Sequence, residues 1–258
     1  MMYLTLDLRC GVSGDMLLGA LLDWYEAEKG DIQPVLDIIM KAASVQSPTR
    51  VWTRNVMRGD LKAKRFYVEW ERLENDTTTG AQMLSYLESG LSLTSMNTRV
   101  KKLAGRMMRI LLEAEAAVHN ERSVNDVHLH EAGTPDTLAD VIGIAYVSDR
   151  LEVDGYWVRS TPVSLGAGTI GTEHGAFDIP VPAVRHLIRE LPARHGPVNG
   201  ELATPTGVAA ARALVEFWMD HGDVGDCAPL KGKPVGRGAG EREYGDGFPN
   251  TLTLYEEV

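Results

Sequence analysis

The chain has 258 residues, of which 44% are hydrophobic and 24% charged, and this ordinary globular composition excludes a disordered or fibrous protein. Its formal net charge of −10 argues against nucleic acid as a partner, because binding to a phosphate backbone requires a basic face. We expect one domain, or two intimate subdomains, since a chain of this length buries a substantial core.

The N-terminal region predicts neither a membrane segment nor an export signal. Its most apolar stretch, Met16 to Leu22, is shorter than the ~20 residues that span a bilayer, and no basic region leads it. Cys10 and Cys227 form no CxxC pair, so reduced thiols are expected. These features predict a cytoplasmic protein without a membrane partner.

The first 25 residues predict a strand, a tight turn and a helix. Residues 3–8 favour a strand, residues 10–15 contain two glycines, and a helix is expected from Met16 to about Tyr25. Ser13 or Asp15 suits the helix N-cap, and the same backbone N–H groups could instead hold an anion.

A hairpin is expected next, with strands at 51–57 and 61–70 around a turn at 58–60. A short helix follows at about 81–88. Thr79 suits its N-cap and Gly90 its stop.

The rest of the chain alternates between helices and short extended segments. From Val100 to Ala117, apolar residues recur at steps of three and four, which predicts an amphipathic helix. The later predicted elements are a helix at 136–151, a strand at 156–163, a turn-rich stretch at 166–175, helices at 183–190 and 206–219, a glycine-rich loop at 232–247 and a strand at 251–255. The pattern predicts an α/β or α+β fold with a mixed sheet and surrounding helices.

The densest polar cluster contains His128, His130, Glu131, Asp136 and Asp140. Alternation in extended chain places the two histidines on one side, and the two aspartates share a helix face. Imidazole and carboxylate together suit a divalent transition metal. On spacing alone, an alternative has equal weight: His130 and Glu131 cap the helix, while Asp136 and Asp140 are solvated.

The glycine-rich turn is a second candidate site. Ser13 and Gly14 could cradle a phosphate, while Asp7 and Asp15 could bind a metal or a ligand hydroxyl. The turn lacks the lysine of a Walker motif and the spacing of a dinucleotide fingerprint, so the residues alone favour an ordinary strand-to-helix turn.

A third candidate combines His174, Glu201 and the two threonines around Pro205, Thr204 and Thr206. Threonines before a helix are good N-caps, and this role alone explains Thr206. A histidine in a loop is usually solvated, which makes a functional role for this group the minority interpretation from the residues alone.

Four separated motifs, taken in order, resemble the LarC family. That family inserts nickel into a pyridinium bisthiocarboxylate mononucleotide, which becomes the nickel-pincer cofactor of lactate racemase. The resemblance covers nearly the whole chain and is carried by Asp7 with Val12–Met16, by His128–Gly133 with Asp136 and Asp140, by His174–Gly175 with Pro180–Ala183, and by Glu201–Gly207.

The resemblance implies that Ni²⁺ and a mononucleotide-type small molecule share one cleft. The implied metal ligands are His128, His130 and Glu131, with Asp136 and Asp140 as ligands or as orienting groups. Ser13, Gly14 and Asp15 would lie near the ligand phosphate, while His174, Glu201 and Thr204 would line the cleft. Glu131 or Glu201 would act as the base.

The chain also departs from the family pattern. Arg9 and Cys10 replace an aromatic residue and a serine, so Cys10 adds a thiol near the turn, and Pro135 alters the helix start. After Ala183 the family's further proline and alanine pattern is replaced by Val184, Arg185 and His186, which leaves ligand contacts there in doubt.

The resemblance assigns residues 1–258 to the N-terminal nickel-insertion part. Full-size members carry a further C-terminal region implicated in CTP binding and hydrolysis. CTP is therefore expected only through that region, supplied by a separate C-terminal subunit, and homo-oligomerisation is left open.

Two other functions fit the same residues. A non-catalytic nickel-binding scaffold would present the metal to a partner, whereas a metal-dependent hydrolase would use the histidines and aspartates with an open water position.

Overall fold

The computed structural model describes residues 2–71, 77–172, 175–196, 198–218 and 230–258. Its centre is a six-stranded mixed sheet, which bears out the predicted α/β class. In spatial order, the strands are β2 (Thr49–Arg58), β3 (Leu61–Trp70), β13 (Lys233–Ala239), β14 (Thr251–Glu257), β1 (Tyr3–Asp7) and β6 (Trp157–Ser160). Neighbouring strands run antiparallel except for the pairs β1–β6 and β3–β13.

The described residues also form short two-stranded ladders outside this sheet. They are β4 (Thr78–Thr79) with β5 (His128–Leu129), β7 (Val163–Ser164) with β11 (Ala193–Arg194), β8 (Gly166–Ala167) with β12 (Gly200–Glu201), and β9 (Thr169–Thr172) with β10 (Gly175–Asp178). The last of these is a hairpin in the stretch predicted as turn-rich.

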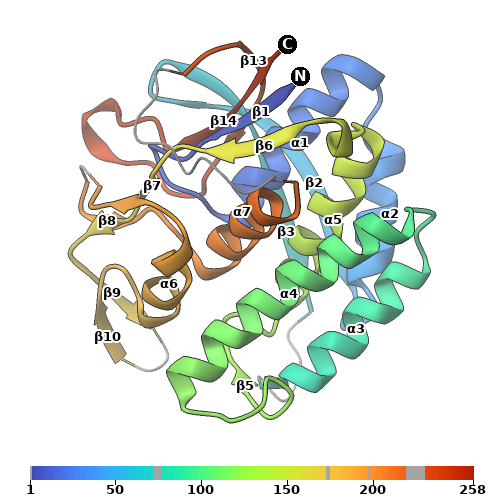
Figure 1. Ribbon diagram of the computed structural model, residues 1–258, viewed down its shortest axis with the longest axis vertical. Helices are drawn as coiled ribbons and strands as arrows, with labels where there is room; N and C mark the ends of the chain where they lie inside the picture. The colour runs from blue at the N-terminus through green and yellow to red at the C-terminus, as the bar shows by residue number, and fades with distance from the viewer. Residues whose placement is uncertain (1, 72–76, 173–174, 197, 219–229) are drawn as a thin grey trace.

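The helices pack in layers beneath the sheet (Figure 1). Helix α1 lies across β3 and β13, α5 and α7 lie beside α1, and α4 crosses α5, α6 and α7. Nearly every residue of α5 is buried as a result. The helices are α1 (Gly14–Lys29), α2 (Gln33–Ala43), α3 (Gly80–Ser92), α4 (Thr98–His119), α5 (Pro135–Arg150), α6 (Pro182–Leu187) and α7 (Pro205–Trp218), with 3-10 turns at Val153–Gly155, Ile188–Glu190 and Gly245–Gly247.

Most of the predicted elements are confirmed, including the hairpin at β2–β3 and the strand at β14. Thr79 caps α3 as predicted, because its side chain accepts a hydrogen bond from the Gln82 backbone N–H in a capping box. Gly90 does not end that helix, which continues to Ser92. A Cβ at Gly90 would lie 2.7 Å from Ile142 Cδ1, so the glycine serves helix packing.

The prediction of a loop at 232–247 is wrong for its first half, which forms β13. The glycines that suggested a loop instead allow α1 to approach the strand closely. A Cβ at Gly236 would lie 2.1 Å from the Ala20 carbonyl oxygen, and one at Gly238 would lie 1.7 Å from that of Met16. A strand glycine thus marks close approach of another backbone.

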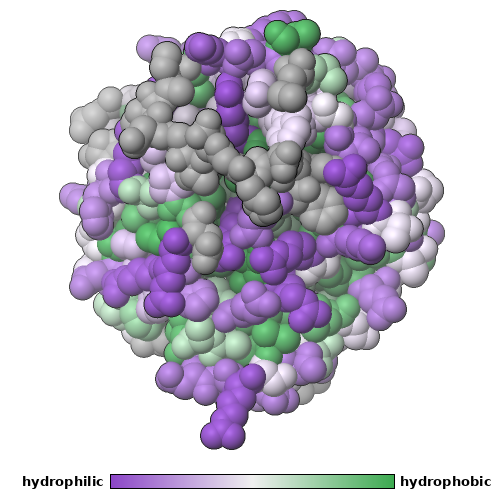
Figure 2. Space-filling model, viewed as in Figure 1, coloured by the Kyte–Doolittle hydropathy of each residue, from purple (hydrophilic) through white to green (hydrophobic). Residues whose placement is uncertain are grey.

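The distribution of hydrophilic and hydrophobic side chains on the surface is that of an ordinary globular protein. On the face shown in Figure 2, hydrophilic side chains predominate among the described residues and hydrophobic ones form small patches. None of the helices in the described part of the chain is long and apolar enough to cross a bilayer.

Candidate functional site

A cavity of about 980 Å³ lies where several helices begin. The N-terminal ends of α1, α5, α6 and α7 reach its wall, together with the last turns of α4 and the second half of β3. The partial positive charge at helix N-termini favours negative groups, whether they belong to the protein or to a ligand.

Backbone contacts bring the first and last predicted motifs together at this cavity. The Val12 N–H donates to the Leu202 carbonyl over 2.7 Å, and the Thr204 N–H donates to the Val12 carbonyl over 3.0 Å. Gly207 permits this approach, because a Cβ there would lie 2.4 Å from the Ser13 Cα. Residues about 190 apart in sequence therefore form one wall.

A second glycine joins the turn to the aspartates of α5. A Cβ at Gly14 would lie 2.1 Å from the Asp140 Oδ2 atom, so only glycine allows the carboxylate to lie against the start of α1. Asp140 is 6% exposed, and its Oδ1 atom is buried without a hydrogen-bond partner. A buried carboxylate oxygen without a donor attracts a proton or a cation.

Helices α1 and α5 begin with the same local arrangement. Ser13 and Thr134 occupy the N-cap positions but do not cap the helices with their side chains. Each hydroxyl is hydrogen-bonded instead to an aspartate two residues later, Ser13 to Asp15 and Thr134 to Asp136. Both carboxylates are thereby held at helix starts, where the helix dipole favours them.

The pKa values of Asp15, Asp136 and Asp140 are all raised above the ordinary value of an aspartate. Burial raises the pKa of Asp15 to about 6 and also raises that of Asp136. Burial, followed by repulsion from Asp15 and Asp136, places the pKa of Asp140 well above its usual range. The part of the cavity wall that these three aspartates form therefore suits a cation, which would take the place of the protons on their carboxyl groups.

Two glutamates on other elements also have raised pKa values. Burial raises the pKa of Glu115, on α4, to about 7, and the charge of Glu131 adds to the shift. Burial also raises the pKa of Glu201, on β12, to about 7, while Arg242 opposes the shift and Glu131 adds to it. Both can exchange protons near neutral pH.

The structure places most of the predicted site residues at one cavity. Ser13, Gly14, Asp15, His130, Glu131, Asp136, Asp140, Glu201 and Thr204 line it. The turn carrying His130 is held by Gln46, whose Nε2 atom donates to the Gly133 carbonyl over 2.6 Å.

Other predicted residues lie elsewhere. His128 is exposed on β5, pairs with Thr79 and is not among the described residues of the cavity wall, so the predicted convergence of the two histidines is not seen. His174 and Cys227 lie outside the described residues. Cys10 is half-buried, and burial raises the pKa of its thiol.

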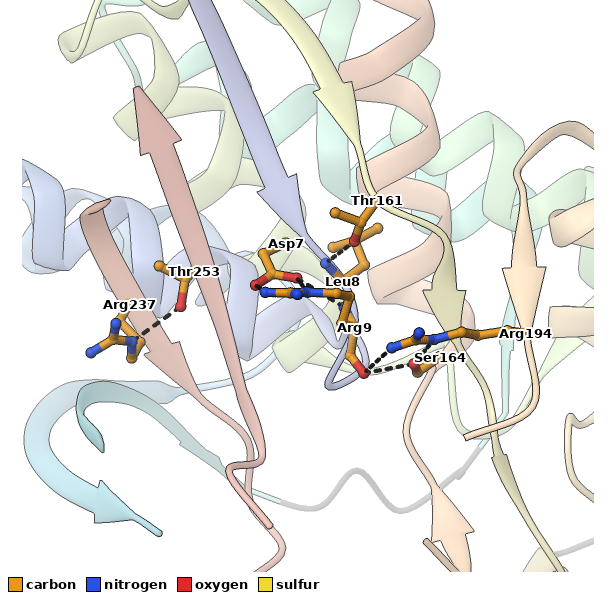
Figure 3. Close-up of polar contacts among 8 residues, drawn as sticks. All are labelled: Asp7, Leu8, Arg9, Thr161, Ser164, Arg194, Arg237 and Thr253. Atoms are coloured by element: carbon orange, nitrogen blue, oxygen red, sulfur yellow. Dashed lines mark hydrogen bonds and ion pairs between the residues drawn. The ribbon is translucent and has the colours of Figure 1, made fainter. Parts of the chain in front are cut away.

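Asp7, a candidate for metal or ligand binding, is paired with an arginine (Figure 3). Arg9 donates to both Asp7 carboxylate oxygens over 2.8 and 2.9 Å. The Arg9 carbonyl accepts from Ser164 over 2.6 Å and from Arg194 over 3.3 Å. These contacts fix the end of β1.

Sequence reasoning missed five arginine, histidine and glutamate residues among the described residues of the cavity wall: Arg65, Glu115, His119, Glu241 and Arg242. Only Glu115 and His119 carried a usable signal, since residues four apart share a helix face. Within the described chain, no three histidine, cysteine, aspartate or glutamate side chains are already arranged to hold one metal ion.

Thr204 also has a structural role that can be tested. Its Oγ1 atom accepts from the Gly207 N–H over 3.2 Å at the start of α7, so Thr204 caps this helix rather than Thr206. We expect Thr204→Ala to lower the free energy of unfolding by about 1 kcal/mol in urea titrations. Thr206→Ala is the control, and an equal loss in both variants would contradict the assignment.

Comparison with known proteins points to one family, both by a family model and by individual relatives. The family model described as nickel insertion protein matches residues 4–257. The pyridinium-3,5-bisthiocarboxylic acid mononucleotide nickel insertion protein of Nocardioides sp. is 34% identical over 98% of this chain and 59% of its own length. The protein of the same name from Geobacillus kaustophilus is 28% identical over 98% of this chain and 59% of its own. The chain thus spans about 60% of these relatives, and no solved structure matches it.

Proposed function

Because this chain belongs to the nickel insertion protein family, whose model spans residues 4–257, we propose that it is a component of a nickel insertase. Its substrates would be Ni²⁺ and pyridinium-3,5-bisthiocarboxylic acid mononucleotide, the compound in the names of two relatives. One observation carries the proposal: a single cavity collects the His130 imidazole, the buried Asp140 carboxylate and several less buried carboxylates from separate motifs.

We propose that His130, Glu131, Asp136 and Asp140 receive the nickel ion. Imidazole and carboxylate are suitable ligands for divalent nickel, and the unpartnered Asp140 oxygen supplies a buried negative atom. Side-chain rotation would be needed for three of these groups to share one ion. His128, which is not among the described residues of the cavity wall, is left out of the proposed ligand set.

A nearby carboxylate would serve as the base. Forming a nickel–carbon bond at an aromatic carbon releases the proton of that carbon, which an acceptor must take up. Burial raises the pKa of Glu201 to about 7, so this group both accepts and releases a proton near neutral pH. Glu131 is the alternative base, since it lines the same cavity.

The relatives extend well beyond the matched region. We propose that CTP acts through a region equivalent to that further part of the relatives. Insertion would then need that further region as well, whereas nickel binding would belong to the matched residues 4–257. We place the reaction in the cytoplasm, as the family function implies, and leave homo-oligomerisation open.

Calorimetric titration with nickel tests the proposal. We expect His130→Ala and Glu131→Ala each to weaken nickel binding more than about tenfold, because each removes a ligand. His128→Ala is the matched control, with an imidazole two residues away and outside the cavity wall. Unchanged affinity in both cavity variants would contradict the proposal.

An insertion assay in the presence of that further region then separates the other functions. Stoichiometric nickel binding without insertion would indicate a scaffold. Zinc on purification together with hydrolysis of simple phosphoesters would indicate a hydrolase.

A further inference from the structure

One arginine of the cavity wall has no role in the chemistry described above. Arg65 lies on β3, where the pairing with β13 consists, among the described residues, of the single pair Lys64–Gly238. Beyond that pair the strand runs along the cavity, and the stretch from Arg65 to Val68 contributes to its wall.

Aromatic rings hold the Arg65 guanidinium in place. Its carbon lies 4.4 Å from the centre of the Tyr67 ring. That ring is stacked on Trp52, with centroids 5.2 Å apart and planes at 3°. A guanidinium held against an aromatic face keeps its fork of donors oriented, so little entropy is lost when it binds an anion.

The same guanidinium is poorly satisfied within the protein. Its Nε atom is buried without a hydrogen-bond partner. Its ion pair with Glu241 is 3.5 Å long, and the Glu241 side chain is 81% exposed, which makes this a weak surface pair. Buried donors without partners are rare in folded proteins, and a ligand is one explanation.

The cavity wall carries both a group of aspartates and this arginine. The aspartates Asp15, Asp136 and Asp140 surround the starts of α1 and α5, so a phosphate there would meet like charges. The charge of Arg65 is felt at the start of α1. It lowers the pKa of Asp15, although burial, the larger effect, raises it.

From this arrangement we propose that Arg65 binds the phosphate group of the organic ligand and that the starts of α1 and α5 receive the cation instead. The ligand class is a pyridine mononucleotide, held by the paired N–H donors of the guanidinium on two phosphate oxygens. This inference rests on the proposed function, and it assigns the phosphate to a side chain of β3, which no motif marked, instead of to the backbone of the glycine-rich turn.

The test compares ligands with and without the phosphate. Nicotinic acid mononucleotide, nicotinamide mononucleotide and nicotinic acid riboside would be titrated into the full chain by calorimetry. We expect both mononucleotides to bind at least about tenfold more tightly than the riboside, since charged hydrogen bonds to the phosphate are lost in the latter.

Arg65→Ala should remove this preference for phosphate, so that mononucleotides and riboside bind alike. Arg65→Lys should retain part of it, because it keeps the charge and loses the fork. Arg54→Ala is the matched control, since Arg54 lies 5.9 Å from the same Tyr67 ring and is not among the described wall residues. A loss of stability alone would weaken all three ligands equally and leave the preference intact.

Three outcomes would overturn the inference: no preference for phosphate in the wild-type chain, a preference retained in Arg65→Ala, or a preference confined to the ligand with the pyridine carboxylate. Nickel affinity measured on the same variants distinguishes this result from a failure of the proposed function. Nickel binding that depends on His130 would stand even if Arg65 proved irrelevant to nucleotides.

Discussion

Replacing Asp140 with asparagine should stabilise the metal-free protein at pH 8 while weakening its binding of nickel. The Asp140 pKa lies well above the ordinary value in the folded protein, so the folded state holds this proton more tightly than the unfolded chain. Stability is then lost as the pH rises from the unfolded pKa of about 4 towards the folded pKa. Asparagine removes that loss, so we expect the variant to be more stable than the wild type at pH 8 and to match it more closely at pH 5.

Urea unfolding at pH 5 and pH 8 measures this effect. The wild-type protein should lose stability between the two pH values, because Asp15, with a pKa of about 6, contributes in the same direction. Asp140→Asn should show a smaller loss. Asp154→Asn, at an exposed position, should behave like the wild type. An Asp140 variant that is less stable at pH 8 would show that the carboxylate stabilises the fold.

The second large effect concerns packing of α1 on the sheet. A Cβ at Gly238 would lie 1.7 Å from the Met16 carbonyl oxygen and 2.7 Å from the Ala20 backbone nitrogen. Both atoms belong to a helix backbone, which cannot rotate away as a side chain could. We therefore expect Gly238→Ala to lower the free energy of unfolding by about 3 kcal/mol or more, measured by urea titration.

Gly105→Ala provides the contrast for that measurement. Gly105 lies inside α4, and a Cβ there would meet no atom within 4 Å. Alanine should stabilise the protein by about 0.5–1 kcal/mol. If the two variants proved equally stable, the close approach of α1 to β13 would be wrong.

Local patterns predicted the elements whose signal lies within a few residues. The alternation along β3 and the apolar stripe of α4 are of this kind. The strand β13 was missed because its glycines are explained by α1, which precedes it by more than 200 residues. Helix α2, Gln33–Ala43, was not predicted, although its apolar residues are buried as in an amphipathic helix.

The site was predicted in part for the same reason. The four motifs named residues that do share a cavity, but spacing alone could not distinguish His130 at the wall from His128 outside it. Arg65 gave no signal, because an arginine in an alternating strand is usually a solvated residue. Only the stack on Tyr67 and the unpartnered Nε atom mark it.

The strand order also bears on when the cavity can form during synthesis. Strand β14, residues 251–257, lies between β13 and β1 and is the antiparallel neighbour of β1. Contacts between distant segments form late and slow folding. A nascent chain on the ribosome therefore lacks the centre of its sheet until residue 257 has left the exit tunnel. The cavity can therefore capture a metal ion only after residue 257 has emerged.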